Sequence, residues 1–108
     1  MQRLWLSALA LALALPAACP AVAATHRETD LYERKRVEPG ELIVRTLGCK
    51  SGDLTGGGYM ISGQPEDRIL YNVTASFPLA DGRWRVDLRN VSGERQPLTL
   101  RVYVLCTD

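Results

Sequence analysis

Few residues of this chain have side chains that could take part in catalysis. The sequence contains one histidine, His26, and because it lies in a charged N-terminal arm, the Ser and Thr hydroxyls have no base to activate them. A pair of carboxylates facing each other across a groove would suit glycoside hydrolysis, but the sequence does not bring any two together. The candidate acids all lie in predicted turns or at exposed strand positions: Asp53, Glu66, Asp67, Asp81 and Asp87. The sequence therefore predicts no enzyme and no catalytic residue.

Metal and cofactor sites find equally little support. A calcium loop needs a run of alternating acids that this chain lacks, and two distant cysteines with one remote histidine do not complete a zinc site. The glycines 56–58 are not followed by the Lys-Ser/Thr pair or the helix of a phosphate-binding loop. Three consecutive glycines in a strand-like context instead indicate a bulge, or a place where another backbone or a ring lies close. We expect no metal and no cofactor.

The cysteines predict one covalent cross-link. Of the three cysteines, Cys19 falls in an N-terminal segment that we expect to be removed, which leaves Cys49 and Cys106 as an even pair. Paired cysteines of small exported proteins form disulfides, because their compartments are oxidising. A Cys49–Cys106 bridge requires the two Cα atoms to lie about 4.4–6.8 Å apart. The ends of two strands would then have to be neighbours.

Residues 1–24 have the features of an export signal. Arg3 precedes an apolar run from Leu4 to Leu15, Pro16 ends the run, and Ala21-Val22-Ala23 fits a signal-peptidase site. As a helix the apolar run would span about 18 Å, against about 30 Å of hydrocarbon, so it is too short for a permanent anchor. We expect an exported protein, periplasmic or extracellular, without a transmembrane segment. Lipidation at Cys19 is the less favoured alternative, because Pro16 stands where a lipoprotein site usually has Leu.

Composition limits the partners that the mature chain can have. The formal net charge is +1, and the loss of Arg3 with the signal leaves basic and acidic residues equal in number. Without a net basic field, bulk attraction to a nucleic acid is not expected. Hydrophobic residues make up 46% and charged residues 23% of the sequence, which is typical of a globular domain. We expect a single small domain that requires a covalent cross-link for stability.

Hydrophobic spacing predicts an all-β domain. Residues 25–36 are dense in charge and are expected as an N-terminal arm, either frayed, a short helical turn or the approach to a weak strand over 31–37. The domain itself is expected over 37–108. Its other predicted strands are separated by Gly, Pro and Asp turns and cover 41–47, 54–62, 69–77, 83–89 and 98–106. About six strands at this spacing favour a small antiparallel β-sandwich with one disulfide, or a barrel.

The two last strands have the clearest alternation. Trp84, Val86 and Leu88 share one face of their strand, and the opposite face is rich in arginine. In the last strand the apolar face runs from Leu98 to Val104 and includes Cys106. If these two strands pair, their polar faces form one basic surface. This candidate binding face consists of Arg83, Arg85, Arg89, Arg101 and Tyr103.

The order of several short motifs resembles a small module of secreted bacterial proteins. The motifs are Cys49-x-x-Gly52, Thr55-Gly56-Gly57-Gly58-Tyr59, Ser76-x-Pro78, Gly82-x-Trp84-x-Val86 and Tyr103-x-x-Cys106. The resemblance covers about 37–107, and Lys50 stands where the family often has Pro. It implies a disulfide-closed β-sandwich that is frequently appended to other secreted regions, such as collagen-like repeats. It implies no catalytic residues.

Taken together, these features predict a non-enzymatic module rather than a catalyst. We expect an exported binding or structural module of the bacterial cell envelope or extracellular space, whose partner is an unidentified envelope glycan or protein. The alternative is a small secreted or periplasmic inhibitor of a hydrolase. In that case the polar loop 63–68 would be the segment inserted into the enzyme, since rigid domains present preorganised loops.

Overall fold

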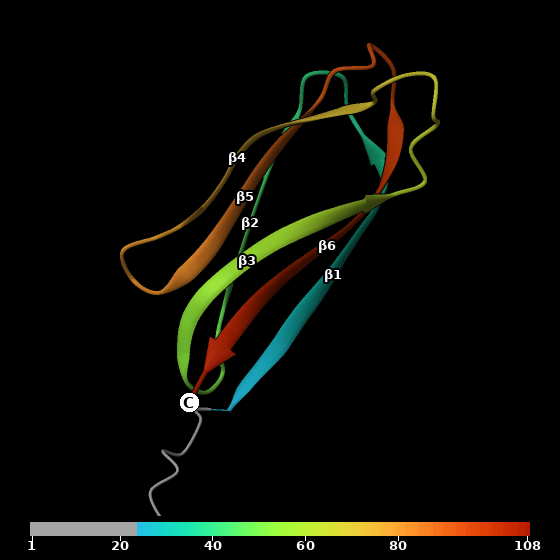
Figure 1. Cartoon of the computed structure of the whole chain (residues 1–108). Helices are drawn as coiled ribbons and strands as arrows, with labels where there is room; N and C mark the ends of the chain where they lie inside the picture. Colours follow the sequence, from blue (N-terminus) through green and yellow to red (C-terminus); the bar gives the residue numbers. More distant parts are fainter. Residues whose placement is uncertain (1–23) are drawn as a thin grey trace, which may run out of the picture.

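The computed structural model describes residues 24–108 as a sandwich of two antiparallel sheets (Figure 1). Each sheet has three strands, in the orders β1-β6-β3 and β2-β5-β4. The predicted export signal and the lipidation alternative at Cys19 lie outside the described residues. The predicted all-β fold with six strands is confirmed. The strands are β1 (Thr25–Val37), β2 (Leu42–Gly48), β3 (Asp53–Ser62), β4 (Tyr71–Pro78), β5 (Arg83–Asn90) and β6 (Gln96–Thr107).

The core lies between the two central strands, β5 and β6. The alternation predicted for them is confirmed, because Val86 and Leu88 of β5 and every second residue of β6 from Leu98 to Cys106 are buried. Side chains of a strand alternate between its two faces, so the intervening residues point to the outer surfaces. The buried cluster consists of Val37, Ile43, Leu70, Tyr71, Val86, Leu88, Leu98, Leu100 and Val102.

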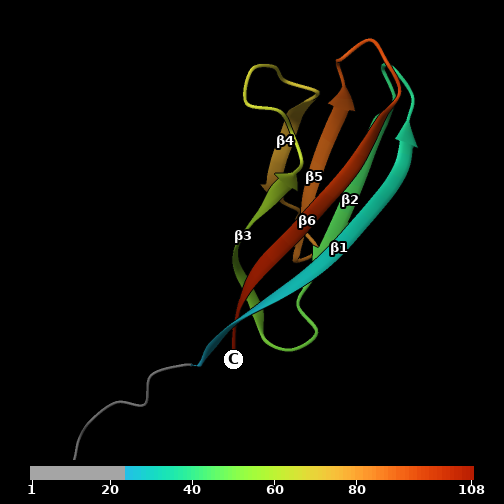
Figure 2. The same cartoon turned by 90° about the vertical axis from the view of Figure 1, so that its right-hand side faces the viewer.

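Strand β1 differs from the arm expected over residues 25–36. It pairs with β6 from Thr25↔Thr107 to Arg34↔Leu98 and forms the long edge strand seen beside β6 in Figure 2. Its charged residues alternate in exposure, with the outward side chains exposed and the inward ones half-buried. The main chain of β6 supplies the hydrogen-bond partners for the backbone of β1. The long polar side chains of β1 cover the edge of the sandwich and keep their charged ends in water. Because both faces of this segment are mostly polar, the alternation of apolar and polar residues that usually predicts a strand is absent from it.

Two predicted turns carry glycines in the left-handed region. Gly82 has φ = 85° in the turn between β4 and β5, and Gly40 has φ = 76° in the turn between β1 and β2. In this region an L side chain is strained, whereas glycine is not. The first turn is closed by the backbone hydrogen bond from Leu79 N to Arg83 O (2.7 Å). The Gly, Pro and Asp turns predicted between the strands are thus confirmed at Asp81-Gly82 and at Pro39-Gly40.

Asn90 is a buried polar residue that ties three segments together. Its side-chain nitrogen donates to the Val37 carbonyl (2.9 Å) and the Glu94 carbonyl (2.7 Å). Its side-chain oxygen accepts from the backbone N–H and the hydroxyl of Ser92 (2.9 and 2.8 Å). One amide therefore joins the end of β1, the end of β5 and the loop that follows β5.

Replacing Asn90 with Ala should lower the free energy of unfolding by about 1–3 kcal/mol. The change leaves a buried carbonyl without its donor, and an unsatisfied buried group costs about that much. Chemical denaturation followed by circular dichroism measures the loss. Asn72→Ala removes an exposed amide and serves as the control, with a change within about 0.5 kcal/mol. Equal stability of the two variants would contradict a structural role for Asn90.

Candidate functional site

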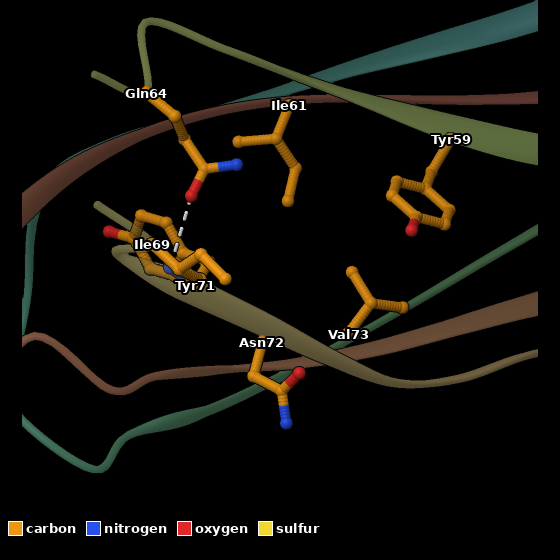
Figure 3. A pocket seen from close by; sticks show the side chains of 7 residues that line it. All are labelled: Tyr59, Ile61, Gln64, Ile69, Tyr71, Asn72 and Val73. Carbon is orange, nitrogen blue, oxygen red and sulfur yellow. Dashed lines mark hydrogen bonds between the residues drawn. The ribbon is translucent and has the colours of Figure 1, made fainter. Parts of the chain in front are cut away.

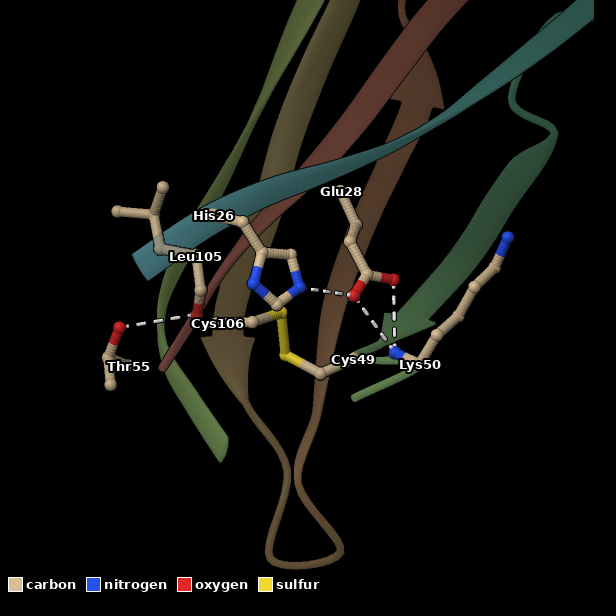
Figure 4. The surroundings of a disulfide bond; sticks show 7 residues. All are labelled: His26, Glu28, Cys49, Lys50, Thr55, Leu105 and Cys106. Atoms are coloured by element: carbon tan, nitrogen blue, oxygen red, sulfur yellow. Dashed lines mark hydrogen bonds and ion pairs between the residues drawn. A yellow bond between two sulfur atoms is a disulfide. The ribbon is translucent and has the colours of Figure 1, made fainter. Parts of the chain in front are cut away.

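The predicted disulfide is confirmed and joins the two sheets. Cys49 follows β2 directly and Cys106 lies on the inner face of β6, with their Cα atoms 6.0 Å apart. Because β2 and β6 belong to different sheets, the bond fastens one layer of the sandwich to the other. Cys106 is fully buried. The bridge stands at the end of the molecule where β1 begins and β6 ends (Figure 4).

A polar group surrounds the disulfide on the side of β1. His26 is the register partner of Cys106, and its Nε2 lies 2.9 Å from a carboxylate oxygen of Glu28. Both carboxylate oxygens of Glu28 accept the backbone N–H of Lys50 at 3.0 Å. This N–H lowers the pKa of Glu28, and His26 lowers it further. The carboxylate is thus held ionised beside the disulfide.

The five residues of the candidate binding face do not share one surface. The condition for a common face, pairing of the last two strands, is not met, because β5 is central in one sheet and β6 is central in the other. Arg83, Arg85 and Arg89 therefore point outward from the β5 sheet. Arg101 and Tyr103 point outward from the β6 sheet, on the opposite side of the sandwich.

Two of the three β5 arginines are neutralised by neighbouring acids. Arg83 lies 2.7 Å from a carboxylate oxygen of Asp81, and Arg85 lies 2.7 Å from one of Asp87. The hydrogen bond with Arg83 lowers the pKa of Asp81, and the one with Asp87 raises the pKa of Arg85. Arg89 donates to the Gly40 carbonyl. This outer face therefore has little free positive charge.

The edge of the sandwich formed by β1 and β2 is closed by charged side chains. Arg45 of β2 lies 3.2 Å from Asp30 and stacks over the Tyr32 ring, with 4.2 Å from its central carbon to the ring centroid. Further along, Arg34 pairs with Glu41 at 3.0 Å. The Nε atom of Arg45 is buried without a hydrogen-bond partner. Long polar side chains thus fill this edge instead of an apolar seam.

The opposite edge, between β3 and β4, opens into a cleft of about 430 Å³. Inward side chains of the two edge strands face each other across it, with Tyr59 and Ile61 from β3 opposite Val73 from β4 (Figure 3). Ile69 at its rim is 70% exposed and Tyr59 is 39% exposed. We call this feature the β3/β4 cleft, and its lining residues are Tyr59, Ile61, Gln64, Ile69, Tyr71, Asn72 and Val73.

Gln64 gives the β3/β4 cleft a polar end. Its side-chain oxygen accepts the backbone N–H groups of Leu70 and Tyr71, both at 3.2 Å. The Tyr71 hydroxyl is drawn away from the cleft and donates to the Pro97 carbonyl at 2.9 Å, and burial raises its pKa. The lining contains no ionisable acid or base apart from the two tyrosines. It is suited to contact with an uncharged ligand.

The acids considered for catalysis are not gathered in a cleft. Asp81 and Asp87 pair with arginines, while Asp53, Glu66 and Asp67 are exposed. Neither the β3/β4 cleft nor a second hollow of about 300 Å³ beside His26 is lined by a carboxylate. Among residues 24–108, no helix is long and apolar enough to cross a membrane.

The chain matches no family model, no curated protein and no solved structure. The part of the resemblance that is confirmed is a small six-stranded antiparallel module in two sheets, closed by the Cys49–Cys106 disulfide. No motif of the sequence predicts the β3/β4 cleft. The one signal that pointed to it is the absence of charged residues from 54–62 and 69–80.

Proposed function

We propose that this chain is an exported, non-enzymatic binding module, and that its ligand is an extended, uncharged segment of a partner protein seated at the β3/β4 cleft. The single observation that carries the proposal is the cleft itself, an uncharged, partly apolar mouth between two edge strands. The membership in a secreted module family and the export signal remain predictions from the sequence, and they agree with this role.

The position of the cleft favours an extended peptide over a compact ligand. Strand β4 is the last strand of its sheet, so one side of its backbone is free to pair with an added strand. A peptide that adds to a sheet edge gains affinity from main-chain hydrogen bonds and specificity from pockets for alternate side chains. At Tyr71, the first residue of β4, Gln64 already takes the place of a neighbouring strand by accepting the backbone N–H. The added segment would therefore pair with the part of β4 that follows Tyr71. One side chain of the added segment would fill the space between Tyr59 and Val73.

The contrast between the two edges of the sandwich strengthens this choice. Soluble proteins protect free edge strands with charges, prolines and bulges, because unprotected edges pair with other chains. β1 carries charges along most of its length, whereas β3 beyond Asp53 and the whole of β4 carry none. Each of these two strands has one register shift, and β4 ends at Pro78, but neither has a charged side chain along the cleft. Exposed Ile69 and Met60 add apolar surface beside the uncharged edges. A partner that lies there would cover this surface.

A titration observed by two-dimensional amide NMR tests the proposal. The probe is a capped heptapeptide of alternating Thr and Val with one central Ile, added to millimolar concentration. We expect shifts confined to backbone amides of β4, the 63–70 loop and the facing part of β3. Shifts absent at that concentration, or centred on β1 and β2, would contradict the proposal. If an N-acetylglucosamine tetramer binds at the cleft and the peptide does not, the ligand of the cleft is a glycan and not a peptide.

Two substitutions sharpen that test. Ile69→Asp places a charge at the rim of the cleft, and we expect it to weaken peptide binding at least tenfold. Val91→Asp is the matched control, because Val91 is another exposed aliphatic side chain, 50% exposed and outside the cleft lining. The control should bind as the unaltered protein does. Equal loss in both variants would show that net charge, and not the cleft, determines binding.

The inhibitor alternative also has an observation in its favour. The loop 63–68 leads directly into Ile69, whose 70% exposure presents an apolar side chain beside the exposed Glu66 and Asp67. If the protein inhibits a hydrolase through this loop, replacing Pro65–Arg68 with a Gly-Ser link should abolish inhibition. That variant keeps Gln64 and the β4 edge, so it should still bind the heptapeptide. Unchanged inhibition by the loop variant would exclude the loop as the inserted segment.

A further inference from the structure

The surroundings of the disulfide bring four metal-ligating side chains to one point. Ligand atoms of His26, Glu28 and Cys106 all lie within 4.8 Å of one another. Cys49 is bonded to Cys106, so its sulfur adds a fourth donor at the same place (Figure 4). The sequence places His26 far from both cysteines. The antiparallel pairing of β1 with β6 brings it directly opposite Cys106.

We propose that reduction of the Cys49–Cys106 disulfide converts this cluster into a zinc-binding site. The four ligands would be the two thiolates, an imidazole nitrogen of His26 and a carboxylate oxygen of Glu28. Zinc prefers this kind of mixed sulfur, nitrogen and oxygen set in tetrahedral geometry. While the disulfide is intact its sulfurs are bonded to each other, and the cluster offers only His26 and Glu28. The inference is independent of the peptide site proposed at the other edge.

The chemistry of the conversion is a thiol–disulfide exchange followed by metal binding. A dithiol reductant supplies two electrons and two protons, which break the sulfur–sulfur bond to give two thiols, and the reductant becomes a disulfide. Zinc then displaces the two thiol protons to solvent and remains divalent. The imidazole must be unprotonated to bind, and the carboxylate is already ionised. Zinc binding therefore releases protons and is favoured by higher pH.

The fold holds the four side chains in place from three directions. His26 and Glu28 are alternate residues on the inner face of β1, Cys106 belongs to β6, and Cys49 follows β2. Two sulfurs on one tetrahedral zinc lie roughly 3.8 Å apart for Zn–S bonds near 2.3 Å, which rotation of the cysteine side chains supplies. The N–H of Lys50 fixes the Glu28 carboxylate. Such outer contacts orient metal ligands and raise affinity.

An approach from solvent lies on the side of His26. A hollow of about 300 Å³ is lined by Thr25, His26, Arg27, Thr55 and Leu105, so the imidazole stands between open water and the buried Cys106. The cluster also sits where β1 starts and β6 ends. Strand ends open locally at low cost in free energy. A small ion and a reductant therefore have a route that leaves the core packed.

Cobalt spectroscopy on the reduced protein tests the proposal. The protein is reduced with dithiothreitol, freed of reductant under nitrogen and titrated with Co²⁺. We expect a near-ultraviolet thiolate-to-cobalt charge-transfer band, intense visible bands of tetrahedral cobalt, and loss of both when Zn²⁺ is added. The oxidised protein should show neither band. Zn²⁺ should also raise the unfolding temperature of the reduced protein and leave that of the oxidised protein unchanged.

Ligand variants separate a four-ligand site from adventitious thiol binding. His26→Ala and Glu28→Gln should each weaken Zn²⁺ binding by the reduced protein at least tenfold. Glu33→Gln is the matched control, since Glu33 is on the same strand but on its exposed face, and it should bind as the unaltered protein does. Unchanged affinity in the His26 and Glu28 variants would overturn the site. So would a reduced protein that unfolds and does not regain β-sheet circular dichroism with Zn²⁺.

Discussion

Cys106→Ser lowers the free energy of unfolding by about 2–5 kcal/mol, an expected loss large enough to prevent stable folding at 37 °C. The bridge closes a loop with a sequence separation of 57 residues, for which the chain-entropy model gives about 4 kcal/mol. A domain of this size has a total stability of only about 5–15 kcal/mol. The bridge also joins two sheets whose edge between β1 and β2 is closed in part by ion pairs, Arg45 with Asp30 and Arg34 with Glu41. Equilibrium denaturation in urea measures the loss.

Three comparisons make this prediction specific to the cross-link. The double variant Cys49→Ser with Cys106→Ser should be about as stable as Cys106→Ser alone, because one cross-link is removed in both. Reduced protein without metal should match them. Thr107→Ala, one position further along β6, should stay within about 1 kcal/mol of the unaltered protein. Two free thiols in the non-reduced, purified protein would contradict the bridge.

The predictable part of the fold is the part that periodicity and turn chemistry specify. The alternation in β5 and β6 placed Val86, Leu88 and the apolar face of β6 in the core, because one face of a strand in a sandwich must be apolar. Asp81-Gly82 fixed a turn, because glycine is favoured where φ is positive. The disulfide followed from the count of cysteines. The strand alternation and the turn depend on residues close together in the chain, and the disulfide depends only on the number of cysteines.

The less predictable part depends on which strands become neighbours. The sequence places Arg101 and Tyr103 with the β5 arginines only if the consecutive strands β5 and β6 pair, yet these strands lie in different sheets. Strand pairing is a property of the whole topology, and local patterns do not encode it. The high charge density of residues 25–36 predicts an arm, because most side chains on the inner face of β1 are polar. Asp30 and Arg34 of that face pair with Arg45 and Glu41 at the sandwich edge, and Tyr32 between them packs against the core.

The candidate sites also depend on which strands become neighbours, and local sequence patterns do not predict them. No local pattern predicts that His26 and Glu28 lie beside Cys106, since only the β1–β6 register brings them there. The β3/β4 cleft was equally hidden, although the uncharged segments that form it are visible in the sequence. The absence of charged residues is not a sequence motif. It points to a binding edge only when the structure shows that the opposite edge of the sandwich is lined by charged side chains.

Gly57→Ala is the substitution for which the structure predicts a large effect from a single methyl group. A Cβ atom at Gly57 would lie 2.5 Å from Cδ2 and 2.7 Å from Cγ of Trp84, well inside van der Waals contact. Trp84 is held by the hydrogen bond from its Nε1 to the Ser76 hydroxyl (2.9 Å) and packs against the core. The ring cannot withdraw without disturbing both. We expect a loss of about 1–3 kcal/mol in unfolding free energy from overpacking.

Gly58→Ala is the matched control, one residue further along β3. Its Cβ would also meet an aromatic side chain, 2.6 Å from the Tyr103 hydroxyl oxygen, but that oxygen is the far end of a side chain on the outer face. Tyr103 can swing into solvent, and replacing glycine with alanine stabilises by about 0.4–1 kcal/mol through the unfolded chain. Gly58→Ala should therefore stay within about 1 kcal/mol of the unaltered protein. In a Trp84→Leu background the penalty of Gly57→Ala should disappear, since the two positions are coupled by contact. A penalty that persists there would place its cause in the backbone of β3 and not in the ring that lies over it.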